Sequence, residues 1–348
     1  MPKPTLRSKW PYCDSSPHNS ITGEKDACGV GFLAQINGKS SNWILRQALR
    51  GLSCMEHRGG CGGDSDSGDG AGLLCEIPWS YLKTVWPEAN KTEKNNTGLG
   101  MVFMPRDKNK RIEAQSFCEE EAQKLGFNSL GWRDVPISLD VLGPLARDNA
   151  PFIQQWLIEN KKNKDDLESL LFRLRRKIGK RARKAWGEKS YELYIASLSN
   201  RTVVYKGMVR SEILAPFYID LQNKDFEISY AVYHRRFSTN TLPRWPLAQP
   251  MRLLGHNGEI NTLLGNLNWA KASESNIEEI WGDNFDDITP IINPDFSDSA
   301  NLDATLELLV KSGRTITESL LTLVPEAFRD QPELRNKPEI SAFYEYSA

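Results

Sequence analysis

The sequence has no long hydrophobic run. None of its 348 residues belongs to a stretch approaching the roughly 18 apolar residues that a membrane span needs, and the N-terminus lacks the apolar core of a secretory signal. These absences argue against a membrane protein and against a secreted one. We therefore expect a soluble, cytoplasmic protein without a membrane partner.

An excess of charge of one sign is also missing. The 44 Lys and Arg residues nearly balance the 45 Asp and Glu residues, so the formal net charge is −1. No global basic field favours nucleic acid as a partner, and no acidic excess favours disorder. The length suits one large domain or two ordinary ones. Because no Gly/Ser-rich linker divides the chain, we predict one domain over residues 28–348.

Patterns that bind metals are scarce. The six cysteines form no C-x-x-C pair, which argues against a structural zinc site, and free thiols are expected. The stretch "DSDSGDG" at 64–70 resembles a calcium loop. However, a calcium loop needs glycine at its sixth position and glutamate at its twelfth, where this chain has Asp69 and Cys75. We predict no metal site, and a tight, hydrogen-bonded acidic turn at 64–70.

Two further patterns resemble binding sites, one for a dinucleotide and one for nucleic acid, but in each case another interpretation is favoured. "GVGFLA" at 29–34 matches a dinucleotide fingerprint, but a polar run precedes it and a strand-like run follows, so the required strand–turn–helix context is absent. Residues 172–184 carry eight Lys or Arg residues. The default interpretation is an amphipathic helix with a solvated basic face, and the alternatives are nucleic acid or an acidic partner. The apolar face of this helix would consist of Leu170, Leu174, Ile178, Ala182 and Ala185.

Hydrophobic patterning predicts many strands and several helices. Strand-like runs occupy 28–36 (as a buried strand), 71–77, 98–104, 135–141, 151–158, 191–198, 202–207 and 226–238. Helical patterns occupy 42–55, 110–125, 164–186, 260–274 and 301–311. Several strands follow one another without an intervening helix, which favours a layered α+β domain over a doubly wound sheet.

Cys28 stands out because of what precedes it. Residues 1–27 are rich in proline and small polar residues, which predicts an extended leader, and the chain turns apolar immediately after Cys28. A cut between Ala27 and Cys28 would give one residue a thiol and a free α-amine. An amine with a pKa near 8 suits a general base at neutral pH, and the thiolate is a strong nucleophile. A buried structural cysteine is the alternative.

Two other segments carry groups suited to binding a substrate. In "HNGE", Asn257 offers a side-chain amide and Gly258 an unshielded backbone N–H, which together are typical of an oxyanion hole. A plain Asn-Gly turn is the alternative. "HRRFST" at 234–239 has two adjacent arginines at a strand end, where surface ion pairing is the alternative to ligand binding.

Together these segments resemble a known family. The chain is similar, over about residues 20 to 348, to the N-terminal glutaminase domain of the large subunit of glutamate synthase, a class II (N-terminal-nucleophile) glutamine amidotransferase. The most specific segment is "CMEHRGGCGGDSDSGDGAG" at 54–72, and "HRRFSTNT" and "HNGEINT" fit the same family. The resemblance implies an αββα sandwich, in which two antiparallel sheets lie between helical layers.

The resemblance also implies roles for individual residues. Cys28 would be the nucleophile once a propeptide, residues 1–27, is removed, and Asn257 and Gly258 would form the oxyanion hole. Four other residues would serve the substrate: Arg236 would hold the α-carboxylate of glutamine, Asp298 its α-ammonium, Arg58 would support the site near the nucleophile, and Thr239 is a weaker candidate for contact.

The implied function is hydrolysis of L-glutamine to glutamate and ammonia through a cysteinyl thioester. The ammonia would pass to a 2-oxoglutarate site in the remaining synthase domains or subunit, where the FMN and the iron–sulfur cluster are expected; none is expected in this chain. The family continues beyond the last residue here, so we expect a domain that is incomplete at its C-terminus. The alternatives are an amidotransferase serving a sugar or nucleotide acceptor, and a non-catalytic interaction module.

Overall fold

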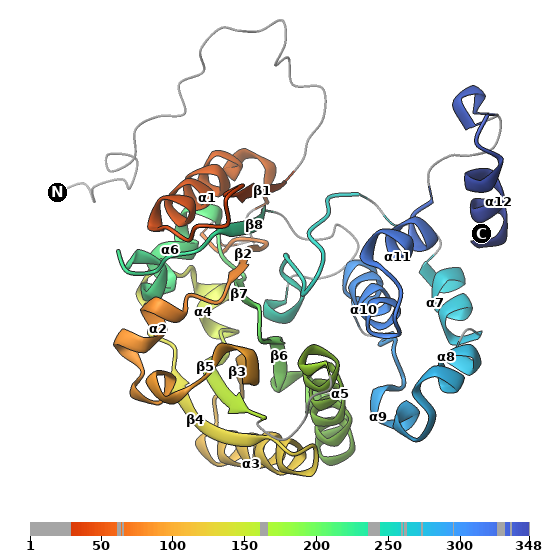
Figure 1. Ribbon diagram of the computed structural model, residues 1–348. Coiled ribbons are helices and arrows are strands. Elements are labelled where there is room, and N and C mark those ends of the chain that lie inside the picture. The colour runs from red at the N-terminus through yellow and green to blue at the C-terminus, as the bar shows by residue number, and fades with distance from the viewer. Residues whose placement is uncertain are drawn as a thin grey trace, which may run out of the picture. The chain divides into compact units, whose positions relative to one another are not determined.

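The computed structural model describes residues 29–60, 64, 66–160, 166–235, 244–258, 260, 263–272, 274–294, 296–325, 331–334 and 336–347. By contacts the chain separates into two compact units, Met1–Glu259 and Ile260–Ala348. Figure 1 shows the described part of the first unit in red through green to teal and that of the second in cyan to dark blue.

The first unit contains two four-stranded antiparallel sheets. One sheet has the strand order β1-β8-β2-β7 and the other β4-β5-β3-β6. The strands are β1 (Val30–Ala34), β2 (Ala71–Glu76), β3 (Thr97–Met104), β4 (Asn128–Asp134), β5 (Phe152–Glu159), β6 (Tyr194–Ser199), β7 (Thr202–Gly207) and β8 (Tyr230–Arg235). The two sheets are in contact, and Gln155 on β5 donates a hydrogen bond to the Tyr205 hydroxyl on β7 at 3.1 Å.

Helix α1 (Asn42–Cys54) covers the sheet that contains β1 and β8. Its buried residues repeat at helical spacing and face the core: Ile44, Leu45, Ala48, Leu49 and Leu52. Close approach is possible because Gly51 has no side chain: a Cβ there would lie 2.5 Å from the hydroxyl of Tyr233 on β8. The helix and the sheet therefore form one tightly packed layer pair.

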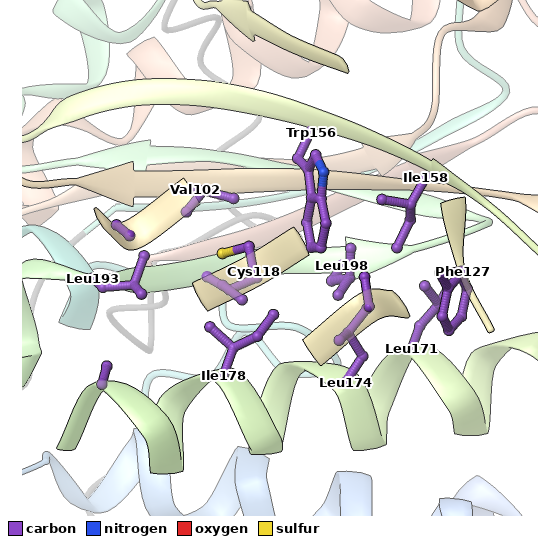
Figure 2. Packing of buried hydrophobic residues seen from close by; sticks show 14 of the residues in the cluster. Val102, Cys118, Phe127, Trp156, Ile158, Leu171, Leu174, Ile178, Leu193 and Leu198 are labelled. Carbon is purple, nitrogen blue, oxygen red and sulfur yellow. The ribbon is translucent and has the colours of Figure 1, made fainter. Parts of the chain in front are cut away.

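Helices α3 (Lys108–Lys124) and α5 (Leu167–Trp186) cover the other sheet. Figure 2 shows Leu171, Leu174 and Ile178 of α5 pointing toward Cys118 of α3 and Trp156 of β5. These side chains are buried, and burial of each large apolar side chain contributes about 1.5–3 kcal/mol before conformational entropy is counted. The layer order is helix, sheet, sheet, helix, which confirms the αββα prediction.

The other helices of the first unit are short: α2 (Trp79–Val85), α4 (Pro144–Asp148) and α6 (Leu214–Phe217). The second unit, where the structure describes it, is helical. Its helices are α7 (Leu263–Ala272), α8 (Glu274–Trp281), α9 (Phe285–Ile288), α10 (Asp298–Lys311), α11 (Ile316–Leu323) and α12 (Pro338–Ser347). Among all the helices that the structure describes, none is both long and apolar enough to cross a bilayer.

Three sequence predictions about local structure were wrong. Residues 135–141 do not form a strand: Ile137 makes one isolated bridge to Tyr218, and a 3₁₀ turn follows, because Pro136 cannot donate to a ladder. The first strand was expected to be buried, but β1 is an edge strand and Phe32 is 76% exposed. Ala185 was placed on the apolar face of α5 and is exposed, whereas the other four residues of that face are buried.

The basic face of α5 is not simply solvated. Arg181 bridges to Glu120 at 2.6 Å and to Glu121 at 3.1 Å, both on α3. The guanidinium of Arg175 lies over the ring of Phe172, 5.5 Å from its centroid. Arg175 and Arg181, two of the eight cations of this segment, therefore make contacts within the fold.

Candidate active site

The site begins at the N-terminal end of β1, directly after Cys28. Cys28 itself lies outside the described residues, but the next residue, Gly29, is described and buried. The backbone N–H of Arg235 donates to the carbonyl of Gly29 at 2.6 Å, and Val30 is paired with His234 in the β1–β8 register. The position that follows the predicted nucleophile is therefore fixed by the sheet.

Gly29 is a position that only glycine fits. A Cβ atom built there would lie 2.0 Å from the carbonyl oxygen of Arg235. The same Cβ would lie 3.4 Å from Oδ1 of Asn257. The side chain of the predicted oxyanion donor is thus next to the residue that follows Cys28, although the two are 228 positions apart in the sequence.

Residues 249–258 form the second part of the site. Gly255 packs against Val30 of β1 and Val232 of β8, and the N–H of His256 donates to Oε1 of Gln249 at 3.0 Å. Asn257 is partly exposed and Gly258 is exposed, so both are accessible from solvent. The backbone of Gly258 does not adopt the left-handed φ that its glycine would permit.

The glycine- and aspartate-rich segment at 56–70 forms the third part. Its first residues form a 3₁₀ turn, Glu56–Arg58, and Arg58 is half-buried at the end of that turn. The fully buried guanidinium of Arg235 donates to both ends of the segment: to Asp69, and to the side chain of Glu56 at 3.2 Å. It also donates to the carbonyl of Gly60 at 3.1 Å.

The acidic turn predicted at 64–70 is confirmed for the residues that the structure describes. Asp64 accepts hydrogen bonds from the backbone of Leu145 at 2.9 Å and from the backbone and hydroxyl of Ser67 at 2.8 and 2.7 Å. These bonds, that of Leu145 above all, hold the pKa of Asp64 well below its usual range. Ser67 in turn accepts from the N–H of Ala146, so the turn is attached to α4. Within the described residues no cluster of three metal-ligating side chains occurs.

Three cysteines can be compared as candidate nucleophiles. Cys75 and Cys118 are free and fully buried, and burial raises the pKa of both thiols far above the ordinary value. Cys54 is disulfide-bonded, so the expectation of free thiols was wrong for this residue. None of these three has the character of a reactive thiolate at neutral pH. Cys13, Cys28 and Cys61 lie outside the described residues.

Three of the predicted substrate residues lie outside the described part of the first unit. Arg236 and Thr239 lie outside the described residues. Asp298 belongs to the second unit, where it is the first residue of α10 and is 8% exposed. Its carboxylate accepts from the N–H of Ser299 at 2.7 Å. Their roles in binding substrate stay predictions.

Sequence reasoning missed residues that hold the site together. Arg235 was treated as one of a pair of arginines, yet it is the buried residue that joins β8 to the 56–70 segment. His234 and Gln249 were not singled out, and both contact the backbone of His256, the residue before Asn257. The available signal was position: His234 and Arg235 lie near the end of the strand predicted at 226–238, directly before Arg236, a predicted substrate residue.

An αββα sandwich whose first strand begins two residues after a cysteine, with an Asn-Gly segment next to Gly29, has the architecture of an N-terminal-nucleophile hydrolase. Comparison with known proteins gives the family. The family model of class-II glutamine amidotransferases matches residues 28–348, and the chain belongs to this family.

The chain is similar to ferredoxin-dependent glutamate synthases. It is 48% identical to the chloroplastic enzyme of Oryza sativa subsp. japonica over 99% of this chain and 22% of the relative. It is 48% identical to enzyme 1 of Arabidopsis thaliana, named chloroplastic/mitochondrial, over 94% of this chain and 20% of the relative. It is 49% identical to enzyme 2 of Synechocystis sp. (strain ATCC 27184 / PCC 6803 / Kazusa) over 94% of this chain and 21% of the relative. The chain spans about a fifth of the length of these relatives.

Proposed function

We propose that this chain hydrolyses the side-chain amide of L-glutamine, with Cys28 as the nucleophile. The observation that carries the proposal is the contact between Asn257 and the position of Gly29, because it puts the side-chain amide group of Asn257 beside the residue that follows the thiol. The family match, which begins at residue 28, supports the same assignment.

The chemistry would proceed in two steps. The Cys28 thiolate attacks the side-chain carbonyl carbon of glutamine, and the oxygen becomes an oxyanion that accepts from the Asn257 amide and the Gly258 N–H. The α-ammonium of Cys28 gives its proton to the leaving nitrogen, and ammonia departs, leaving a thioester. Water activated by the free α-amine then hydrolyses the thioester and releases glutamate.

Residues from three other segments of the chain are proposed to recognise the substrate. Arg236 would hold the α-carboxylate of glutamine through a bidentate pair, and Asp298 would accept from the α-ammonium. Arg58 would support the site from the 56–70 segment, whose attachment to β8 through Arg235 favours this role. Thr239 remains the weaker candidate.

Residues 1–27 are proposed to be a propeptide. While Ala27 is joined to Cys28, the nitrogen between them is an amide and cannot accept the thiol proton. Cleavage would create the α-amine base in place. Intact mass spectrometry of active protein is expected to show an N-terminus at Cys28, and an active sample that retains Met1 would contradict the proposal.

The ammonia is proposed to serve a 2-oxoglutarate site in further synthase domains, which would carry the FMN and the iron–sulfur cluster. The relatives are named ferredoxin-dependent glutamate synthases, which favours ferredoxin as the electron donor and argues against a sugar or nucleotide acceptor. We also propose a cytoplasmic location, as in a cyanobacterial setting such as that of the Synechocystis relative; several plant relatives are named chloroplastic.

The test of the proposed function is loss of glutamine hydrolysis in Cys28→Ser, measured by ammonia release. Removal of a nucleophile is expected to lower kcat by orders of magnitude, so activity above about a tenth of wild type would reject Cys28. Cys118→Ala, which alters a buried thiol in the α3 layer, is the matched control and should keep most of the activity.

A further inference from the structure

His234 lies at the junction of the site's parts. It sits in β8, with Val30 of β1 opposite it on one side and Gly72 of β2 on the other. Its side chain is 1% exposed, and its Nε2 lies 2.8 Å from the carbonyl oxygen of His256. This carbonyl belongs to the peptide group that leads directly into Asn257.

The direction of this hydrogen bond follows from its partner. A carbonyl oxygen can only accept, so Nε2 of His234 must carry a proton and donate it. The neighbouring N–H of His256 donates to Oε1 of Gln249, which is 4% exposed. The backbone on both sides of the His256 α-carbon is therefore held by a buried side chain.

We propose that His234 is a positioning residue, whose Nε2–H holds the carbonyl of His256 and so fixes Asn257 and Gly258 as oxyanion donors. This inference rests on the proposed function. A donor acts on the transition state only if it stands at hydrogen-bond distance from the place where the charge develops, and supporting residues must hold that geometry to about 0.5 Å. Because the donors are needed most in the transition state, their displacement affects kcat more than KM.

The experiment compares His234→Gln with His234→Asn in the full chain. The amide nitrogen of glutamine can reach the place of Nε2, whereas that of asparagine reaches only the place of Nδ1. We expect His234→Asn to lower kcat of glutamine hydrolysis about 10- to 100-fold with little change in KM, and His234→Gln to restore most of it. The rate at which iodoacetamide alkylates Cys28 should be unchanged in both, because alkylation needs no oxyanion hole.

Each possible outcome decides the matter. Equal, near-wild-type kcat in both variants would overturn the proposal, as would equal losses accompanied by slower alkylation, which would indicate a structural role only. If His234→Asn does not fold, His234→Met replaces it: methionine cannot donate to the His256 carbonyl, so His234→Met should lower kcat while His234→Gln keeps most of it. An inactive wild type would instead refute the proposed function, and this inference with it.

Discussion

Replacing Gly29 by alanine would show whether the end of β1 must stay where the structure places it. The new Cβ would lie 2.0 Å from the carbonyl oxygen of Arg235, and real Cβ atoms essentially never come within 3.0 Å of another heavy atom. The strand end must therefore shift by about 1 Å, because overpacked groups move apart rather than overlap. The shift falls mainly on β1, since β8 is held between β1 and β2.

This displacement is next to the predicted nucleophile. A misplacement of about 1 Å is expected to lower kcat of glutamine hydrolysis about 100-fold, and overpacking to lower the free energy of unfolding by about 1–3 kcal/mol. Ammonia release and urea denaturation measure the two effects. Gly179→Ala is the control: its Cβ meets nothing within 4 Å, so kcat should not change and helix α5 should gain up to about 1 kcal/mol. If Gly29→Ala kept kcat within about threefold of wild type, the close approach would not matter and the reasoning would fail.

Asn257→Ala should lower kcat about 10²–10³-fold by removing one predicted oxyanion donor. Arg236→Lys should mainly raise KM, because lysine cannot form the bidentate pair with the α-carboxylate of glutamine. Steady-state kinetics that showed the two effects exchanged would mean that the two roles are swapped. Asp64 has a lowered folded-state pKa, so its ionised form stabilises the fold above the unfolded pKa of about 3.9, and this contribution is lost as the pH falls further. The difference in Tm between wild type and Asp64→Asn should accordingly be constant from pH 8 to 5 and shrink below about pH 4. A Tm difference that increased below about pH 4 would contradict a lowered pKa of Asp64. Asp220 is 0% exposed and pairs with Arg133 at 2.7 Å. Asp220→Leu should therefore lower the free energy of unfolding, measured by urea denaturation, by about 3–5 kcal/mol. A decrease under about 1 kcal/mol would show that the guanidinium of Arg133 finds other partners.

Local pattern predicted most strands of the first unit because they carry continuous apolar or β-branched runs. The strand at 202–207 was predicted with the observed bounds of β7. Strand β4 was missed since its sequence, "NSLGWRD", is polar and contains Gly131, where the backbone has a φ of 146° and the register with β5 shifts. Such a strand is specified by its partner more than by its own residues.

The site could be predicted only in part for a similar reason. Cys28, Asn257 and Gly258 stood out by their residue types and neighbours, but their roles came from the family resemblance and stay predictions. Arg235 is different, because its burial is set by Glu56 and Asp69, which are separated from it by more than 160 positions. No sequence periodicity carries that information; it arises only when β8 lies between β1 and β2.

The end of β8 explains how one short segment can organise distant parts of the chain. Successive side chains of a strand point to opposite faces of the sheet, so neighbouring residues can serve different loops. His234 contacts the segment that carries Asn257, while Arg235 holds the segment at 56–70 and its backbone N–H holds Gly29. A change at Arg235 would release the segment at 56–70 by removing a partner of the partly buried carboxylates of Glu56 and Asp69, so its effect on activity could not be separated from its effect on folding. A change at His234 removes its hydrogen bond to the carbonyl of His256, which is why the positioning of the predicted oxyanion donors is better tested there.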